Sequence, residues 1–325
     1  MIIHGIQLLN FKFILMNHLE SAFYRKNAFW RYLVMTGAVF IAANTIGAIP
    51  LIIVIIIKAV SDPQALSELA NNPANYEILG LNSNAGLAVM LFPFIAGLLA
   101  FALLIKPLNA RTVIQTINGT QKVRWGKIAI SAAIWIIISI IYLFIQIELD
   151  KENFVLNNLS TTLIGLIVVS LALIPFQAAF EEVLFRGYLM QGFAVLTRNR
   201  WAPVLLTSLF FALMHIANPE IKEFGFLTMM PQYFLFGLIF GITTVLDDGI
   251  EIAIGAHAAN NIFLSVMVTN KSSALQTPAV FEQTVIHPWT EFAGLLISSV
   301  VFLILLKKIF KWKDMMVLFR KIDIH

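Results

Sequence analysis

The sequence contains no cysteine among its 325 residues. This absence excludes disulfide bonds, a thiolate nucleophile and zinc sites built from cysteine. Charged residues are also scarce, since they make up 12% of the chain, whereas soluble domains carry about 25%. Hydrophobic residues make up 59% of the chain, and the mean hydropathy is +0.85. The composition therefore indicates a protein that lies largely in lipid.

Long polar blocks are missing as well. The apolar runs recur from near residue 33 to residue 306, and no polar segment between them is long enough to fold separately. The net charge of +4 comes from short basic clusters beside apolar runs, where orientation in the bilayer explains them. We therefore expect the lipid bilayer, and no nucleic acid, as a partner. His4 and Lys12 interrupt the first apolar stretch, so we expect no cleavable signal peptide.

Eight apolar stretches have the length of about 17–25 residues that a helix needs to cross the hydrocarbon core. They are residues 33–57, 85–105, 127–147, 160–180, 201–217, 224–246, 252–269 and 288–306. The predicted fold is therefore all-α, a polytopic membrane bundle of about eight transmembrane helices.

Basic residues concentrate in the connection 106–126 and in the C-terminal tail that follows residue 306. By the positive-inside rule both segments are cytoplasmic. The opposite connections are richer in Asn, Ser, Asp and Glu, and eight crossings then place both termini in the cytoplasm. We expect a multi-pass protein of a bacterial inner membrane.

The chain divides into four segments on this basis. Residues 1–31 form an N-terminal cytoplasmic or interfacial segment, in which apolar residues at helical spacing predict a helix lying on the membrane surface. The others are N-terminal transmembrane helices (32–159), core helices that carry the motifs below (160–270), and the last transmembrane helix with its basic cytoplasmic tail (271–325).

The apolar stretch from Leu159 to Leu196 is far longer than one crossing needs. Pro175 lies inside it and predicts either one long bent helix or a broken pair, because proline removes a backbone hydrogen bond. Simple counting also puts Glu181 toward the inner end of its span and His215 near the outer end of 201–217. If the two share a site, the helix ends differ from these ranges.

Three polar clusters lie within the apolar runs, where each ionisable side chain costs about 2.5–3.5 kcal/mol on insertion scales. The first contains Glu181, Glu182 and Arg186. Glu182 and Arg186 are four residues apart, so a helix stacks them on one face as an ion pair. Glu181 is rotated by about 100° from Glu182 and is the freer general base. The alternative is a buried structural ion-pair network.

The second cluster is His215, which follows Phe211 by four residues on an apolar helix that ends at Asn218 and Pro219. An isolated histidine of this kind is often a core residue with satisfied hydrogen bonds, and this alternative stays open.

The third cluster contains His257 and Asn261, which are four residues apart and face the same way, with Asn260 as a nearby competitor. The alternative here is a hydrogen-bonded contact between helices, worth about 0.6 kcal/mol in membranes. Together, a base, two imidazoles and a carboxamide are the groups needed to activate a water molecule and to hold an oxyanion in peptide hydrolysis.

These residues resemble the CAAX-prenyl-protease and bacteriocin-processing family of membrane endopeptidases, also called CPBP or Abi. The family's motifs Glu-Glu-x-x-x-Arg, Phe-x-x-x-His and His-x-x-x-Asn occur here in order, over roughly residues 160–270. The resemblance implies that Glu181 and His215 activate the attacking water and that His257 and Asn261 stabilise the oxyanion. It implies that Glu182 and Arg186 support the site, and that the substrate is a peptide or a membrane protein.

Metal dependence stays open at this point. No cofactor is certain, but Glu181, His215 and His257 would make a known zinc ligand set of two histidines and a glutamate. No His-Glu-x-x-His helix strengthens that case. The chain also has no Gly-x-Ser or Gly-x-Gly-Asp motif of other intramembrane proteases. The competing hypothesis is a membrane scaffold or bacteriocin-immunity protein without catalysis, and a transporter fits less well because no repeated halves are seen.

Overall fold

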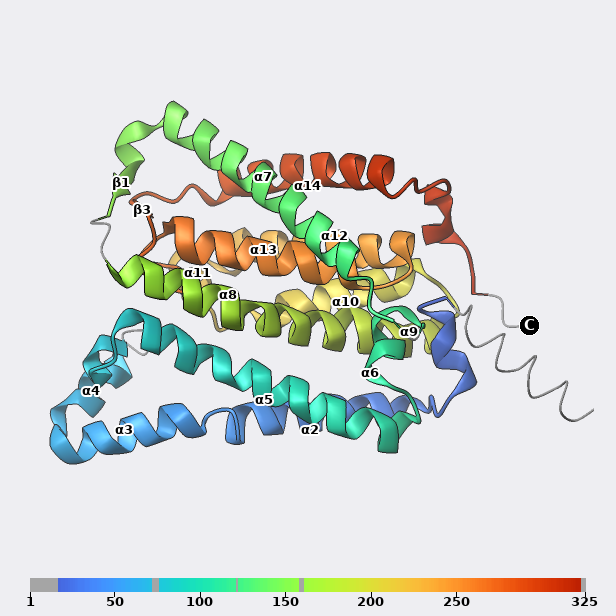
Figure 1. The fold of residues 1–325 in the computed structure, drawn as a ribbon, viewed down its shortest axis with the longest axis horizontal. Coiled ribbons are helices and arrows are strands. Elements are labelled where there is room, and N and C mark those ends of the chain that lie inside the picture. The colour runs from blue at the N-terminus through green and yellow to red at the C-terminus, as the bar shows by residue number, and fades with distance from the viewer. Residues whose placement is uncertain (1–16, 72–75, 121, 158–160, 323–325) are drawn as a thin grey trace, which may run out of the picture.

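The computed structural model describes residues 17–71, 76–120, 122–157 and 161–322, and it is a bundle of helices that lie roughly along one axis (Figure 1). The main helices are α2 (Phe29–Thr45), α3 (Ile49–Ser61), α4 (Gln64–Asn71), α5 (Ser83–Asn109), α6 (Val113–Asn118), α7 (Trp125–Leu149), α8 (Thr161–Glu182), α9 (Met190–Thr197), α10 (Trp201–Met214), α11 (Pro219–Phe224), α12 (Phe226–Asp247), α13 (Glu251–Met267) and α14 (Pro288–Ile309). The predicted all-α membrane bundle is confirmed.

The number of full-length crossings differs from the prediction. Within the described residues, six helices are long and apolar enough to cross a membrane, with α2 and α3 counted as one. The predicted stretches 201–217 and 252–269 correspond to α10, with 14 residues, and α13, with 17 residues. Helix α10 is too short for a full crossing, since it ends just before His215. Helix α13 lies at the lower limit of length, and His257, Asn260 and Asn261 interrupt its apolar character. The connection between α3 and α5, one of those expected opposite the basic segments, also contains the helix α4.

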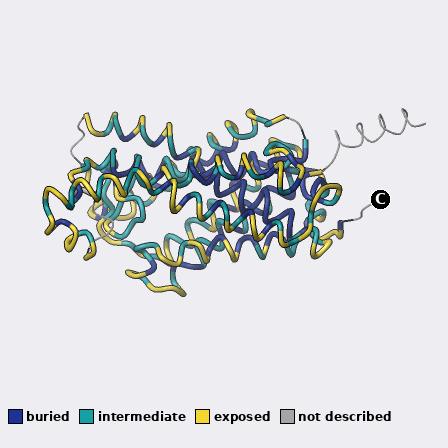
Figure 2. Tube along the Cα trace, turned by 90° about the horizontal axis from the view of Figure 1, so that it is seen from below, coloured by how far each residue is buried: buried dark blue, intermediate teal, exposed yellow. Residues whose placement is uncertain are grey.

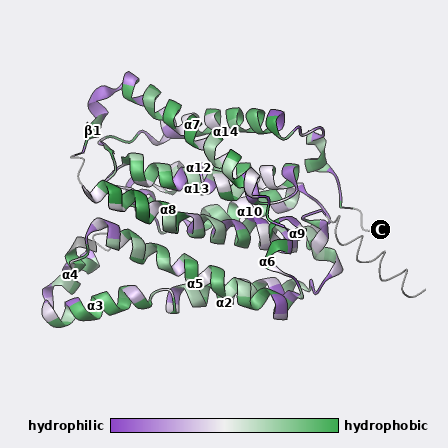
Figure 3. Cartoon of the chain, viewed as in Figure 1, coloured by the Kyte–Doolittle hydropathy of each residue, from purple (hydrophilic) through white to green (hydrophobic). Residues whose placement is uncertain are grey.

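The outer helices present apolar surface to their surroundings. Figure 3 shows hydrophobic positions along the length of the helices and hydrophilic ones gathered near the ends of the bundle. Helix α3, which the structure describes in full, has no buried residue although it is almost entirely aliphatic. Leu103, Ile137 and Val300 are exposed on three further helices. Such a surface is stable when lipid covers it, which makes this a multi-pass membrane protein.

One continuous helix of 37 residues runs from Thr161 to Thr197, so this stretch is a single long helix and not a broken pair. The chain stays helical through Pro175. The hydrogen-bond pattern changes further on, where Val183–Leu189 forms a π-helical segment, η4, directly after Glu182. Segments of this kind insert an extra residue into a helix and occur frequently at functional sites.

The shared turn between α9 and α10 sets the depth of the candidate residues. Glu181 precedes Thr197 by 16 residues, and His215 follows Trp201 by 14 residues. At about 1.5 Å per residue, both lie about 21–24 Å from this turn. The apparent mismatch in depth is thereby removed, because the helix that contains Glu181 extends beyond the predicted end at residue 180.

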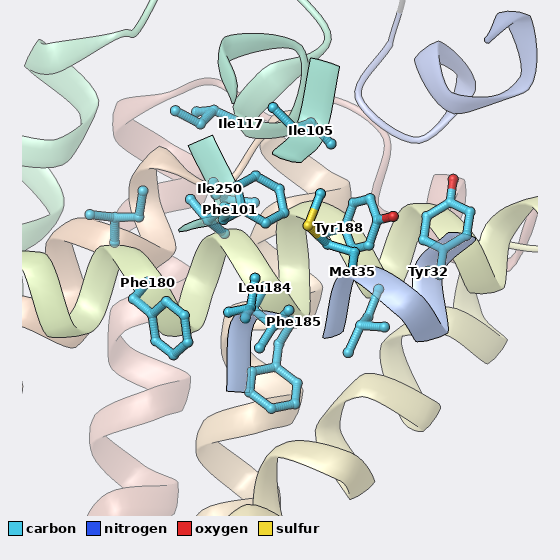
Figure 4. Close-up of a cluster of buried hydrophobic side chains, with 14 of the residues drawn as sticks. Tyr32, Met35, Phe101, Ile105, Ile117, Phe180, Leu184, Phe185, Tyr188 and Ile250 are labelled. Carbon is cyan, nitrogen blue, oxygen red and sulfur yellow. The ribbon is translucent and has the colours of Figure 1, made fainter. Parts of the chain in front are cut away.

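Buried residues gather along the middle of the bundle, as Figure 2 shows. One apolar cluster joins α2 and α5 to the long helix, with Tyr32, Phe101 and Tyr188 fully buried (Figure 4). A second joins α7, α12, α13 and α14 around Trp135 and Phe302. Because α13 packs between α7 and α8, the third motif is held against the first.

A small sheet connects loops at the end of the bundle opposite α6 (Figure 1). It consists of β1 (Phe154–Leu156), β2 (Val268–Thr269) and β3 (Phe281–Gln283) in the order β1-β3-β2. Strand β3 pairs antiparallel with β1, with Phe154 opposite Gln283, and parallel with β2. The sequence analysis did not predict these short strands.

The predicted surface helix lies mostly in residues 1–16, which are outside the described residues. The part of the segment that is described packs on protein. The 3-10 helix η1 (Glu20–Tyr24) packs against α9, and His18, just before it, contacts Arg186 of the π-helical segment. His18 and Ser21 are buried. This placement differs from an interfacial position because polar side chains here find hydrogen-bond partners within the bundle.

Candidate active site

A cavity of about 510 Å³ lies between α5, α7, α8, α12 and α13 and reaches the loops that carry β2 and β3. Glu181, His215, His257 and Asn261 all line it. The three motifs therefore converge on one space, although 24 residues separate Arg186 from Phe211 and 41 separate His215 from His257.

Glu182 and Arg186 form the predicted ion pair. Nη1 of Arg186 donates to Oε1 of Glu182 at 2.8 Å, and both side chains are fully buried. The same oxygen also accepts a hydrogen bond from Nδ1 of His257 at 2.7 Å. Glu182 therefore holds the imidazole in one orientation and leaves Nε2 of His257 as the nitrogen that faces the cavity.

Glu181 has one oxygen that is held and one that is free to react. Oε1 accepts a hydrogen bond from Nε2 of Gln177 at 2.6 Å. Oε2 is buried, lies 3.6 Å from Nε2 of His257, and has no hydrogen-bond partner within the described residues. A buried polar atom without a partner is costly, so this oxygen is suited to bind a water molecule or a substrate group.

Gln177 belongs to a directed chain of hydrogen bonds that ends on Glu181. Nε1 of Trp135 donates to Asn260 at 3.1 Å, Asn260 donates to Asn261 at 3.0 Å, and Asn261 donates to Oε1 of Gln177 at 2.9 Å. The indole can only donate, so the direction of every later bond in the chain is fixed. The carboxamide oxygens thereby point away from Glu181, and the amide of Gln177 points toward it.

Gln177 and Trp135 lie outside the predicted set of site residues. A signal for Gln177 was present, because it precedes Glu181 by four residues and therefore lies on the same helix face. Trp135 gave no such signal, since it comes from α7, outside the three motifs.

His215 lies at the C-terminal cap of α10. Its Nδ1 is 2.8 Å from the carbonyl oxygen of Phe211 and donates to it, which leaves Nε2 available to the cavity. The ring of Tyr233 stacks on the imidazole with centroids 4.2 Å apart. The hydroxyl of Tyr233 accepts from Asn218 at 2.9 Å and donates to Glu220, so this histidine is held from two sides.

Arg186 lies behind the cavity, beneath aromatic rings. Its guanidinium carbon is 4.2 Å from the ring centroid of Phe211 and 5.6 Å from that of Phe240. Phe240 also stacks on His257, with centroids 5.4 Å apart. Cation–π contacts of this kind stabilise a desolvated cation by about 2 kcal/mol. The two rings therefore link the buried arginine to the imidazole.

The N-terminal segment contacts the opposite side of the π-helical segment. Nε2 of His18 donates to the carbonyl oxygen of Arg186 at 3.0 Å, and Gln191 donates to the carbonyl oxygen of His18 at 2.8 Å. Burial lowers the pKa of His18 to about 4 despite the bond to Arg186. Burial likewise raises the pKa of Asp248, which accepts from the backbone amide of His18, to about 6. His18 is thus docked as the neutral imidazole on the helix that carries the first motif.

The donor set for a metal ion is not assembled. Among the described residues, no three His, Asp or Glu side chains lie together in a group that could hold a metal ion. This includes Glu181, His215 and His257, the set left open for zinc. The bond from Nδ1 of His257 to Glu182 does not bear on this, because metal-binding histidines commonly donate their other nitrogen to a carboxylate and Nε2 stays free. No chemical step below uses a metal.

Comparison with known proteins locates the resemblance in the same region. Residues 163–263, which include all three motifs, match the family model described as type II CAAX prenyl endopeptidase Rce1-like. The chain is also 27% identical over 277 residues to a Bacillus subtilis (strain 168) protein named Uncharacterized protein YyaK, and this alignment covers 84% of the present chain and 90% of that protein. No solved structure matches the chain.

Proposed function

We propose that the chain is a membrane endopeptidase, on the premise that residues 163–263 match the family model of the Rce1-like CAAX prenyl endopeptidases. It hydrolyses a peptide bond in a peptide or in a membrane-associated substrate. Both termini lie in the cytoplasm, and the membrane is a bacterial inner membrane. The basic residues of 106–126 and of the tail support this orientation.

One observation carries the proposal. The Oε2 atom of Glu181 is buried without a hydrogen-bond partner in the described part of the chain, and it faces the same cavity as His215, His257 and Asn261. Oε2 of Glu182 is also buried without a partner among the described residues, but Glu182 does not line the cavity. Of the two adjacent glutamates, only Glu181 therefore presents its free oxygen to a space that a water molecule or a substrate can enter. A general base needs such an oxygen to receive a proton.

The reaction begins when Glu181, together with Nε2 of His215, binds and orients a water molecule. Glu181 takes one proton from the water, and the water oxygen forms a bond to the scissile carbonyl carbon. The carbonyl oxygen becomes an oxyanion. Glu181 then delivers its proton to the leaving amine as the C–N bond breaks. One water molecule is consumed, and a carboxylic acid and an amine are released.

The oxyanion is stabilised by donors on α13. Nε2 of His257 and the second amide hydrogen of Asn261 are the two candidates, since the first amide hydrogen is used by Gln177. For Nε2 to donate, His257 is the imidazolium. Its charge and that of Arg186 then balance those of Glu181 and Glu182, so the buried group is neutral overall. Donors fixed before the reaction account for a large share of catalysis in such sites.

Substrate trapping tests the proposal. The Glu181→Gln variant keeps the shape of the side chain and removes the base, so substrate should accumulate on the purified protein and be identified by mass spectrometry. Cleavage of that substrate by the unmutated protein should exceed cleavage by the variant by about 10²–10⁴-fold, the usual contribution of a general base. Equal activity of the two proteins would contradict the role of Glu181 and favour the scaffold hypothesis.

A metal measurement belongs to the same experiment. We expect no loss of activity with a chelator, and no bound zinc that differs between the unmutated protein and Glu181→Gln. Inhibition by the chelator together with loss of zinc in the variant would instead support a metal-activated water.

A further inference from the structure

The charges that line the cavity are all of one sign apart from the two imidazoles. Glu181, Glu220 and Glu291 line it, and no Lys or Arg does so among the residues that the structure describes. Glu220 comes from α11, and Glu291 comes from the first turn of α14. The three carboxylates therefore approach the cavity from three different helices.

Glu291 is held by neutral groups only. Its oxygens accept hydrogen bonds from the hydroxyl of Tyr142 at 3.0 Å, from Gln146 at 2.8 Å and from Gln283 at 3.1 Å. None of the ion pairs in the described part of the chain involves Glu291. Its side chain is fixed in place while its negative charge stays uncompensated.

Glu220 is linked to His215 through Tyr233 and has one carboxylate oxygen without a hydrogen-bond partner. Its Oε1 accepts from Tyr233, whose ring stacks on His215. Its Oε2 is buried and has no hydrogen-bond partner within the described residues. Glu220 is therefore one aromatic ring away from the imidazole that we assign to the water, and it can accept one more hydrogen bond.

The same end of the bundle is acidic beyond the cavity. Among the described residues, the connections at this end carry five further acidic residues and three lysines. None of these eight residues lines the cavity. The acidic residues are Glu148, Asp150, Glu152, Glu223 and Glu282, and the lysines are Lys151, Lys222 and Lys271. A cleft with apolar walls and charges of one sign concentrates ligands of the opposite charge.

The position of the opening is also informative. The cavity is lined by residues of β2, β3 and the loop between α13 and α14, and by none from 106–126 or from the tail. It therefore reaches the end of the bundle opposite the two basic segments. In the orientation proposed above, this is the extracytoplasmic end.

We propose that the cavity selects a basic peptide segment that enters from the end of the bundle opposite the basic segments. A Lys or Arg side chain of the substrate pairs with Glu291, and a basic side chain nearer the scissile bond pairs with Glu220. Apolar residues that flank the basic one contact the cavity-lining side chains of Phe94, Phe224 and Phe236. This inference rests on the proposed endopeptidase function, and it makes Glu220 and Glu291 specificity-determining residues.

A library of synthetic peptides tests the inference with the full-length protein in detergent micelles. The peptides share an apolar sequence and carry Lys, Gln or Glu at one position, and the products are quantified by mass spectrometry. We expect Lys peptides to be cleaved about tenfold faster than Gln peptides, and Glu peptides most slowly. Glu291→Gln should abolish the preference, and Glu291→Lys should reverse it. Glu282→Gln is the matched control, since it lies at the same end outside the cavity lining.

The result separates the two proposals. Cleavage of all peptides at equal rates would overturn the substrate class and leave the endopeptidase function standing. If no peptide is cleaved, fluorescence polarisation with labelled Lys and Glu peptides measures binding instead. About tenfold tighter binding of the Lys peptide that is lost in Glu291→Gln would support the basic-segment inference without catalysis. Equal affinity for both peptides would overturn it.

Discussion

Replacing Gln177 by methionine removes the link between Glu181 and Asn261 while keeping the length of the side chain. Gln177 donates to Glu181 at 2.6 Å and accepts from Asn261 at 2.9 Å. A hydrogen bond to a charged group contributes about 1.5–3 kcal/mol, and about 1.4 kcal/mol corresponds to a tenfold change in rate. If the bond serves mainly to orient the base, cleavage should fall by about 10- to 150-fold.

A second variant grades the effect along the hydrogen-bond chain. Trp135→Phe keeps an aromatic ring but removes the donor to Asn260, which lies three bonds from Glu181. A neutral hydrogen bond contributes about 0.5–1.5 kcal/mol, so cleavage should fall by about 2- to 12-fold. The order of activity should therefore be unmutated protein, Trp135→Phe, Gln177→Met and finally Glu181→Gln.

The assay measures the cleavage rate per folded molecule, with folded yield taken from size-exclusion chromatography in detergent. Gln232→Met is the matched control. Gln232 lines the same cavity, but it donates to the carbonyl oxygen of Pro288 and takes no part in the hydrogen-bond chain that ends on Glu181. Full activity of Gln177→Met would refute the reasoning. So would an equal loss of activity in Gln232→Met, because the effect would then belong to the cavity wall in general.

Three further predictions concern stability and topology. Glu182→Gln should lower the stability by about 3–5 kcal/mol, because it breaks a fully buried ion pair, and the folded yield should fall with it. It should also reduce cleavage per folded molecule, because His257 loses its charged partner. Normal yield with full activity would contradict both expectations. Cysteines introduced into 106–126 or into 307–325 should react only with a reagent that reaches the cytoplasm, and labelling from outside would reverse the topology. Because burial lowers the pKa of His18 from 6.5 to about 4, His18 contributes a loss of about 3 kcal/mol of stability as the pH decreases from about 6.5 to 4. Asp248 acts in the opposite direction over this range, because its pKa is raised to about 6 and the folded state binds its proton first. Thermal unfolding should therefore show His18→Asn becoming more stable relative to the unmutated protein as the pH falls, and an identical pH profile for the two proteins would exclude the buried neutral histidine.

Much of the fold follows from hydropathy alone. Each predicted apolar stretch corresponds to a helix, because burial of backbone polar groups in lipid leaves few alternatives to helix. The pairing of Glu182 with Arg186 followed from their spacing of four residues. Convergence of the three motifs could be expected because intramembrane polar groups are costly unless they share partners.

Other features depend on contacts that spacing cannot reveal. The bond between His257 and Glu182 joins α13 to the long helix, and a sequence pattern does not give the rotation of one helix relative to another. Pro175 suggested a break in the helix, yet the irregularity occurs at the π-helical segment, which contains no proline. Docking of His18 was missed because an apolar periodicity near the N-terminus favoured a lipid surface over a protein one.

The shortness of α10 has a consequence for the surrounding bilayer. With 14 residues the helix is about 21 Å long, whereas the hydrocarbon core is about 30 Å thick. Leu205, Leu209 and Leu213 are exposed along it and so contact lipid tails. A helix shorter than the hydrocarbon core thins the membrane beside it. We therefore expect a thinner bilayer next to His215, where a polypeptide anchored in lipid would have less hydrocarbon to cross before it reaches water.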